Sequence, residues 1–179
     1  MSAGRWRTAA GIALVPVLLT AGCAVKRIDN GVYHSPKGYR VTIPGPHWSA
    51  VTDGRADLEL RHRSSPAAMA VNAVCDAATT RRGARILSRQ LLVGLRGRKV
   101  VESGDVEIAG RTAVRAVVDA RQEGSETPVR IETIVLNDDR CVYDLMYVAP
   151  PATFDDTRAE FERLADSFRT DRPDPTGTE

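Results

Sequence analysis

Three cysteines and three histidines are the residues of this sequence best suited to redox, nucleophilic or metal chemistry. The cysteines are Cys23, Cys75 and Cys141, and none of them forms a Cys-x-x-Cys redox pair with another. The histidines are His34, His47 and His62, and they have no metal-ligand spacing to one another or to the cysteines. We therefore expect neither a metal nor another cofactor.

The segment before Cys23 determines where that thiol is located in the cell. Arg5 and Arg7 precede an uncharged run of 13 residues, Thr8 to Thr20, which is rich in Leu, Val and Ala and interrupted by Pro16. This run is shorter than the ~20 apolar residues of a membrane-spanning helix, but it fits the hydrophobic region of a secretory signal peptide. The sequence therefore predicts a signal peptide over residues 1–22 and export of the remaining chain.

Leu19-Thr20-Ala21-Gly22-Cys23 resembles the lipobox of bacterial lipoproteins, although Thr20 stands where Leu is commonest. In that family the cysteine receives a diacylglycerol and becomes the mature N-terminus. The resemblance implies acyl chains such as palmitate on Cys23 and a tether over residues 23–30. Because Ala24 is not the Asp that retains such proteins in the inner membrane of enteric bacteria, the periplasmic face of an outer membrane is favoured if the cell has one. The alternatives are an ordinary secretory signal with an incidental cysteine and, less favoured, a transmembrane anchor.

Cys75 and Cys141 each lie in an apolar run that predicts a strand. Export places both in an oxidising compartment, where a pair of thiols is more often bonded than free. We therefore expect a Cys75–Cys141 disulfide. The alternative is two buried, unpaired thiols that pack as small apolar side chains.

The mature chain has one pronounced charge asymmetry. Apolar residues at steps of three and four between Thr79 and Leu95 predict an amphipathic helix. Its polar face and the residues just beyond it carry no acid but many bases, namely Arg81, Arg82, Arg85, Arg89, Arg96, Arg98 and Lys99. Such a face suits an anionic partner such as phospholipid headgroups. The alternative is a solvated helix face whose counter-charges come from elsewhere in the fold.

Composition and motifs limit the remaining function classes. The net charge of +2 disappears with residues 1–22, which leaves 23 basic and 23 acidic residues, so we expect no nucleic-acid partner. No HExxH, GxSxG, P-loop or GxGxxG motif is present in the sequence. The pairs Asp138-Asp139 and Asp155-Asp156 are explained by a turn and by a helix N-terminus. The sequence thus predicts a protein that is not an enzyme.

Other patterns predict an antiparallel sheet and a second helix. A Pro36-x-Gly38 turn predicts a hairpin over residues 32–43, and Trp48 is expected to pack under a sheet edge. Residues 67–75 read as a central strand, and the alternation from Val100 to Val148 predicts a meander. A closing helix is expected after Pro150-Pro151, with Thr153 and Asp156 as a capping box.

This order of elements resembles the PsbP-like fold of many bacterial lipoproteins. Short runs carry the resemblance: Gly38-Tyr39-Arg40-Val41-Thr42-Ile43-Pro44 with Trp48, Gly110-Arg111-Thr112-Ala113, and Cys141-Val142-Tyr143-Asp144. It implies an α+β domain over residues 31–169, with an antiparallel sheet of about six to eight strands in ββββ-α-ββββ-α order and two helices forming an α/β/α sandwich. Residues 170–179 are expected to be a disordered tail.

The resemblance also implies a class of function, because members of that fold are mostly small binding or assembly-assisting proteins. We therefore expect a lipid-anchored protein of the cell envelope that binds a neighbouring envelope protein or a lipid-like ligand. A purely structural envelope lipoprotein is the first alternative, and an unrecognised hydrolase is the second. A cavity between sheet and helix favours a binding protein, whereas a filled core favours a structural one.

Overall fold

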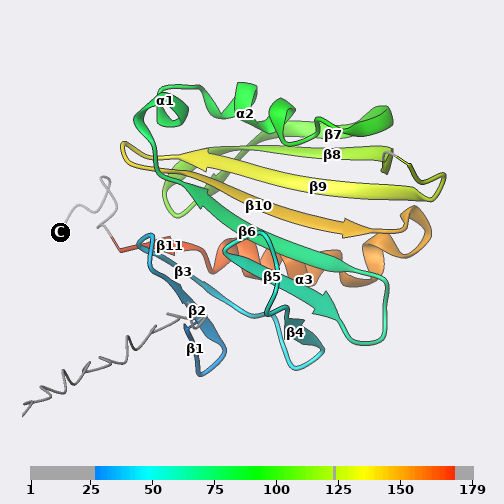
Figure 1. Ribbon diagram of the computed structural model, residues 1–179, viewed down its shortest axis with the longest axis horizontal. Helices are drawn as coiled ribbons and strands as arrows, with labels where there is room; N and C mark the ends of the chain where they lie inside the picture. Colours follow the sequence, from blue (N-terminus) through cyan, green and yellow to red (C-terminus); the bar gives the residue numbers. More distant parts are fainter. Residues whose placement is uncertain (1–26, 123, 172–179) are drawn as a thin grey trace, which may run out of the picture.

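The computed structural model describes residues 27–122 and 124–171, which form two antiparallel sheets with helices on both faces of the larger one (Figure 1). The expected signal peptide, Cys23 and the chain from residue 172 lie outside the described residues. The larger sheet has seven strands in the order β4-β5-β6-β10-β9-β8-β7. Its strands are β4 (Trp48–Ala50), β5 (Leu58–His62), β6 (Ala68–Val74), β7 (Leu95–Ile108), β8 (Arg111–Gln122), β9 (Pro128–Asn137) and β10 (Val142–Ala149).

The second half of this sheet is the predicted meander. Strands β7, β8 and β9 each pair with the next strand in the chain, and β10 pairs with β6 on its other side. Strand β6 lies between β5 and β10, which confirms the prediction of a central strand over residues 67–75. Successive side chains of each strand point to opposite faces. On β10, for example, Tyr143 and Leu145 belong to the main core, whereas Val142 packs with a helix on the other face.

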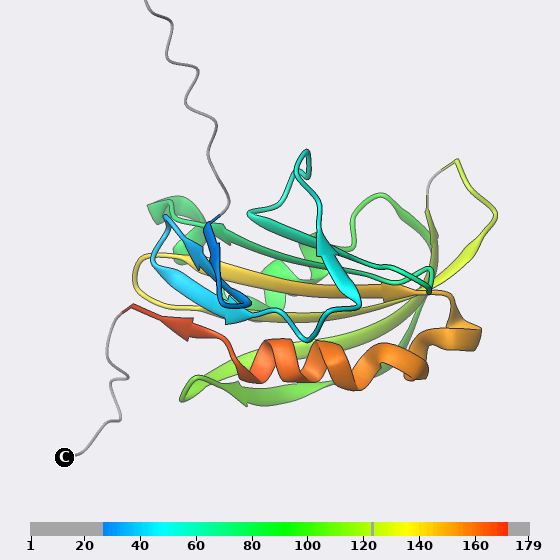
Figure 2. The same cartoon turned by 90° about the horizontal axis from the view of Figure 1, so that it is seen from below.

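The main core lies between the large sheet, a long C-terminal helix and a smaller sheet. Helix α3 (Phe154–Asp166) follows the 3-10 turn η1 (Pro151–Thr153) and runs along one face of the strands (Figure 2). Its buried residues Phe161, Leu164 and Ala165 have helical spacing and pack into the main core. Burial of each large side chain contributes about 1.5–3 kcal/mol, so this apolar stripe holds the helix on the sheet.

The smaller sheet has four strands in the order β1-β2-β3-β11. They are β1 (Arg27–Asp29), β2 (Val32–Ser35), β3 (Tyr39–Thr42) and β11 (Arg169–Thr170). The β2–β3 pair is the predicted hairpin, and Gly38 adopts the positive φ of +81° that its turn needs. Asp57 joins the two sheets, because one carboxylate oxygen accepts from the Tyr39 hydroxyl at 3.1 Å and from the Ala73 amide at 2.9 Å.

The class of fold is as predicted, an α+β arrangement with an antiparallel sheet covered by helices. The large sheet alone falls within the predicted range of strand number, and the small sheet adds the short strands β1 and β11. Arg27–Asp29 of the expected tether form β1. Thr170, where we expected the tail to begin, pairs with Tyr39 in β11.

The predicted helix over residues 79–95 is wrong in extent. Two short helices occur there, α1 (Ala77–Thr80) and α2 (Ala84–Gln90), and Leu95 already belongs to β7. Gly83 is the N-cap of α2 in an extended conformation, and Gly94 has a φ of +88°. Glycine is a weak helix former, and these two glycines lie in the break before α2 and in the turn between α2 and β7, although the leucine spacing continues.

The predicted capping box at the start of α3 is also wrong. The Thr153 side chain makes no capping hydrogen bond, and its hydroxyl oxygen has no partner among the described residues. The chain passes from η1 directly into α3, so Thr153 has a ψ of only 10° instead of the extended backbone of a usual N-cap. Asp155 and Asp156 still lie in the first turn, where negative charge is favourable.

Candidate functional site

The predicted disulfide is present and joins β6 to β10. Cys75 follows the last residue of β6, and Cys141 precedes the first residue of β10, so the antiparallel pairing of Val74 with Val142 brings the two cysteines together. Their Cα atoms are 4.1 Å apart, and 66 residues separate them in the chain. The bond therefore closes the two central strands at one end, beside the start of α1.

The four arginines that we singled out, Arg81, Arg82, Arg85 and Arg89, are all exposed. We call them the basic surface. Arg81 and Arg82 lie between α1 and α2, whereas Arg85 and Arg89 are one turn apart on α2. Arg96, Arg98 and Lys99 belong to β7 instead of the helix, so the seven basic residues do not share one helix face.

Few acidic groups neutralise the basic surface. Arg85 forms an ion pair of 2.8 Å with Asp105 of β7, and both side chains are more than half exposed. Arg82 donates a hydrogen bond of 3.4 Å to the Gln90 side chain. Within the described part of the chain, Arg81 and Arg89 have no ion-pair partner. Exposed pairs of this kind contribute little free energy, so these side chains are available to an external anion.

Two exposed aliphatic side chains accompany these arginines. Ile86 on α2 is 56% exposed, and Val93 in the turn after α2 is 75% exposed. The buried side of α2 is formed by Leu87 and Ser88, so Ile86 points away from the sheet together with Arg85 and Arg89. Basic and aliphatic side chains on one exposed surface are typical of segments that lie in a membrane interface.

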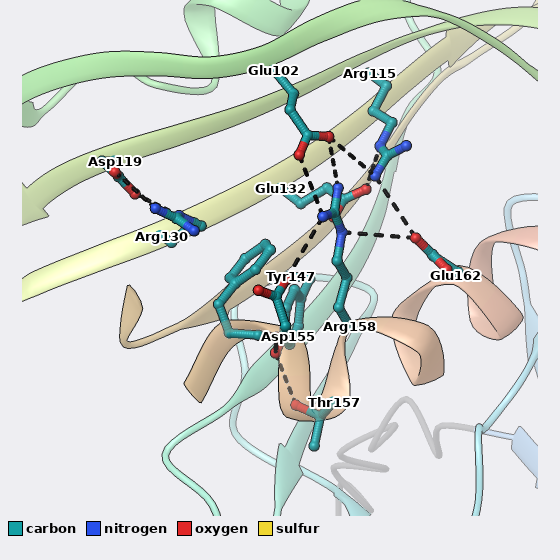
Figure 3. Close-up of polar contacts among 11 residues, drawn as sticks. Glu102, Arg115, Asp119, Arg130, Glu132, Tyr147, Asp155, Thr157, Arg158 and Glu162 are labelled. Atoms are coloured by element: carbon teal, nitrogen blue, oxygen red, sulfur yellow. Dashed lines mark hydrogen bonds and ion pairs between the residues drawn. The ribbon is translucent and has the colours of Figure 1, made fainter. Parts of the chain in front are cut away.

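A second cluster of charges lies on the opposite face, between the sheet and α3 (Figure 3). Its centre is Glu132 of β9, which is 0% exposed. Glu132 accepts from Arg115 Nε at 2.6 Å and from Arg158 Nε at 3.0 Å. Arg158 also pairs with Glu102 at 2.8 Å and places its guanidinium 5.5 Å from the centre of the Phe154 ring.

In the Glu132 cluster, guanidinium groups bind the carboxylates directly. The hydrogen bond and charge of Arg158 lower the pKa of Glu102, and Arg130 lowers the pKa of Asp119 in a two-bond pair of 2.7 and 3.0 Å. Carboxylates held ionised by bound guanidinium groups are poorly suited to general acid–base work near neutral pH. We interpret this cluster as the attachment of α3 to strands β7, β8 and β9.

Sequence reasoning missed this cluster. In β9, Glu132 lies on the face of the sheet that α3 covers, and it is buried there. Its partner Arg158 is 26 residues away, so no local pattern links them. A further cleft of about 220 Å³ borders the cluster and is lined by Arg115, Glu132, Ile134, Glu162 and others.

The remaining predicted features are accounted for by the fold. Asp138 accepts from the amides of Arg140 and Cys141 and from the Tyr143 hydroxyl, which is the turn role expected for it. Among the described residues, no group of three or more His, Cys, Asp and Glu side chains is placed to hold a metal ion. In the same part of the chain, no helix has the length and apolarity needed to cross a bilayer.

No family model matches the chain, and no curated protein matches its sequence. Solved structures do match. A protein from Bacteroides thetaiotaomicron superposes with a TM-score of 0.59 at 11% identity; the match covers 79% of this chain but only 48% of that one. The PsbP protein of the cyanobacterium Synechocystis, CyanoP, gives a TM-score of 0.55 at 13% identity and covers 78% of this chain and 91% of its own.

A third match is LpqN of Mycobacterium tuberculosis, described as involved in cell envelope biogenesis. Its TM-score is 0.52 at 12% identity, over 75% of this chain and 84% of LpqN. Identities this low establish the fold alone. The chain therefore has a PsbP-like fold, as the short runs around Gly38, Gly110 and Cys141 indicated.

Proposed function

We propose that this chain is a lipid-anchored protein of the bacterial cell envelope that acts by binding, without catalysis, and that its basic surface contacts an anionic membrane. The anchor is the acylated Cys23, which follows the signal peptide. The outer membrane is the destination in cells that have one. The observation that carries the proposal is the group of four exposed arginines around the exposed Ile86 and Val93.

This surface combines two contributions to membrane affinity. Each arginine near anionic headgroups contributes about 1 kcal/mol, an interaction that salt screens. The two aliphatic side chains add apolar burial in the headgroup region. Because Arg85 and Arg89 share a face of α2 with Ile86, both contributions act from the same side of the domain. A solvated helix face needs no exposed aliphatic residues, so Ile86 and Val93 favour the membrane contact.

Two further observations support an envelope location. LpqN, which has the same fold, is described as involved in cell envelope biogenesis. The disulfide between Cys75 and Cys141 suits a protein that folds outside the cytoplasm. The alternative, a purely structural lipoprotein, is favoured by the large apolar core on the α3 face, but it leaves the exposed basic surface without a role.

The test measures vesicle binding by a chain that begins at residue 23 and carries Cys23→Ser, so neither the signal peptide nor a lipid contributes. Sedimentation with phosphatidylglycerol-containing vesicles is expected to fall as salt rises from about 50 to 500 mM, because the Debye length shortens over this range. Replacement of Arg81, Arg82, Arg85 and Arg89 by Gln is expected to reduce binding by at least about tenfold at low salt.

The matched control replaces four exposed arginines elsewhere, Arg40, Arg55, Arg61 and Arg63, by Gln. It changes the net charge equally and is expected to retain most of the binding. Equal losses in the two variants indicate only an effect of total charge and overturn the membrane contact. Capture of one anionic envelope protein that depends on the basic surface, without vesicle binding, identifies a protein partner instead of the membrane.

A further inference from the structure

The outer face of the large sheet carries a trough beside α2 that the proposed function does not use. On β6 and β10, every second side chain points to this face, and the strand register places them in four pairs. We call these eight residues the β6–β10 trough; they are Val74 with Val142, Asn72 with Asp144, Ala70 with Met146, and Ala68 with Val148. At about 3.4 Å per residue, the four pairs extend over about 20 Å.

The trough is apolar and partly open. Seven of its residues are half-buried, whereas Val142 is buried under α2 with Leu87. Next to α2 it deepens into a cleft of about 240 Å³ whose walls are Val74, Thr79, Leu87, Gln90, Leu91, Val142 and Asp144. At the other end, Ala68, Ala70, Met146 and Val148 help to line a smaller cleft of about 120 Å³. The small alanine side chains leave this space.

Asp144 is the one acidic residue among the eight residues of the trough, and its surroundings are unusual for a carboxylate. Its Oδ1 atom is buried and has no hydrogen-bond partner among the described residues. Desolvation by burial raises the pKa of this carboxyl to about 6. A buried polar atom without a partner costs about 1–3 kcal/mol, so it calls for an explanation such as an absent ligand.

The charged residues that border the trough do not supply that partner. They are Asp76, Arg81 and Arg82 at α1, Arg85 and Arg89 on α2, and Glu59 and Arg61 on β5. Arg82 bonds to Gln90 and Arg85 to Asp105, and Asp76 caps α1. On the neighbouring strand β9, Thr133 is fully buried on the same face, and its hydroxyl oxygen also has no partner within the described residues.

We propose that the β6–β10 trough binds an aliphatic amine, with the ammonium group at Asp144 and the apolar chain along Met146 and Val148. The ammonium supplies both hydrogen-bond donors and the positive charge that the isolated carboxylate lacks. The alkyl chain covers the apolar side chains of the trough, each methylene contributing by its burial. This site is independent of the basic surface and of membrane binding, and it goes beyond the function proposed above.

The test uses n-octylamine, with 1-octanol and octanoate as matched probes of equal chain length. They are titrated into the full chain, with its disulfide intact, by NMR of the methionine methyl groups. Met146 lies in the trough, whereas Met69 is 2% exposed and points into the main core on the other face. Octylamine is expected to shift the Met146 signal saturably and to leave the Met69 signal nearly unchanged, and octanoate is expected to bind at least about tenfold more weakly.

Three variants, one of them a control, test where the ammonium group and the alkyl chain of octylamine bind. Asp144→Asn keeps the shape and is expected to weaken octylamine by at least about tenfold while changing octanol by less than about twofold. Asp156→Asn, an exposed site on α3, is the control and is expected to leave both unchanged. Ala70→Leu fills the trough and is expected to weaken amine and alcohol alike. Equal binding of octylamine and octanoate, an unshifted Met146 signal, or unchanged amine binding by Asp144→Asn overturns the proposal.

Discussion

Asp144 and Glu132 show, at the scale of single residues, how differently this fold treats two acids in neighbouring strands. Glu132 is fully buried but receives two guanidinium groups, whereas Asp144 is less buried and receives none. A buried charge is tolerated when it is paired and is costly when it is not. The contrast therefore separates an acid that serves packing from one that is suited to a ligand.

Asp144 is expected to make stability depend on pH. Its folded pKa is about 6, above the ~3.9 of an unfolded chain, so the folded state binds the proton more tightly. The carboxyl therefore carries no penalty below about pH 4, a growing penalty from 4 to 6, and the full penalty above 6. Asp144→Asn is expected to raise the free energy of unfolding by up to about 3 kcal/mol at neutral pH. The difference should vanish near pH 4 in urea titrations; a variant that is less stable at neutral pH contradicts this account.

Loss of the buried Glu132 carboxylate is expected to destabilise the fold far more than loss of the more exposed Asp119 carboxylate. Glu132→Ala removes the buried carboxylate that Arg115 and Arg158 share under α3 and is expected to cost about 3–5 kcal/mol. Asp119→Ala breaks the more exposed pair with Arg130 and is expected to cost about 1 kcal/mol or less. Chemical denaturation measures both. Similar losses in the two variants show that the buried cluster does not attach α3.

At the scale of elements, strands were predictable and the helices beside them less so. The β2–β3 hairpin and the β7–β10 meander follow from period-two alternation and from turn residues such as Gly38 and Gly110. The prediction of one helix over residues 79–95 is wrong because the leucine spacing does not indicate where the helix is interrupted. Gly83 and Gly94 lie at the two interruptions of the helical pattern. The pairing of Leu95 with Gln122 then places the following residues in β7.

A candidate site could be predicted from the sequence only where all of its residues lie in one short segment of the chain. The basic surface lies within nine residues of chain, so the absence of acids was visible in the sequence. The β6–β10 trough joins residues from two distant strands, and only the register shows that Asn72 lies opposite Asp144. One signal was nevertheless present, because Asp144 is a single acid in an apolar run, on the same side of the strand as Val142 and Met146.

The disulfide is the covalent link between elements, and its removal tests how much the pairing of β6 with β10 depends on it. The loop it closes is long, so the chain-entropy relation gives a stabilisation of about 4 kcal/mol. Replacement of both Cys75 and Cys141 by Ala is expected to lower the free energy of unfolding by about this amount. Cys23→Ser serves as the control and is expected to leave it unchanged. Peptide mapping without reductant that recovers free Cys75 and Cys141 thiols from the native protein contradicts the bond.

At the scale of the whole molecule, the two outer features lie on the same side of the sheet and the filled core lies on the other. The basic surface and the trough both border α2, whereas α3 and the small sheet close the opposite face. This asymmetry places both candidate binding features on one side of the domain and the main core on the other. It also leaves the long, exposed edge strand β7 next to the arginines, where its basic residues Arg96 and Lys99 extend the positive charge.

The lipid anchor is the part of the proposed function that determines where the domain is located. We propose that export places the domain in an oxidising compartment and that the lipid keeps the basic surface close to a membrane, so that weak contacts operate at high local concentration. Acyl chains contribute ~0.8 kcal/mol per buried methylene, far more in total than the arginines. In the function that we propose, the arginines orient the domain on the membrane, while the lipid on Cys23 holds it there.

Mass spectrometry of the native protein extracted from membranes tests this claim most directly. We expect a mature chain that begins at Cys23 and carries a diacylglycerol on its thiol. A Cys23→Ser variant is expected to lack the acyl mass and to leave the membrane in high salt. A native chain that begins at another residue, or that carries no acyl mass and washes off in salt, contradicts the account.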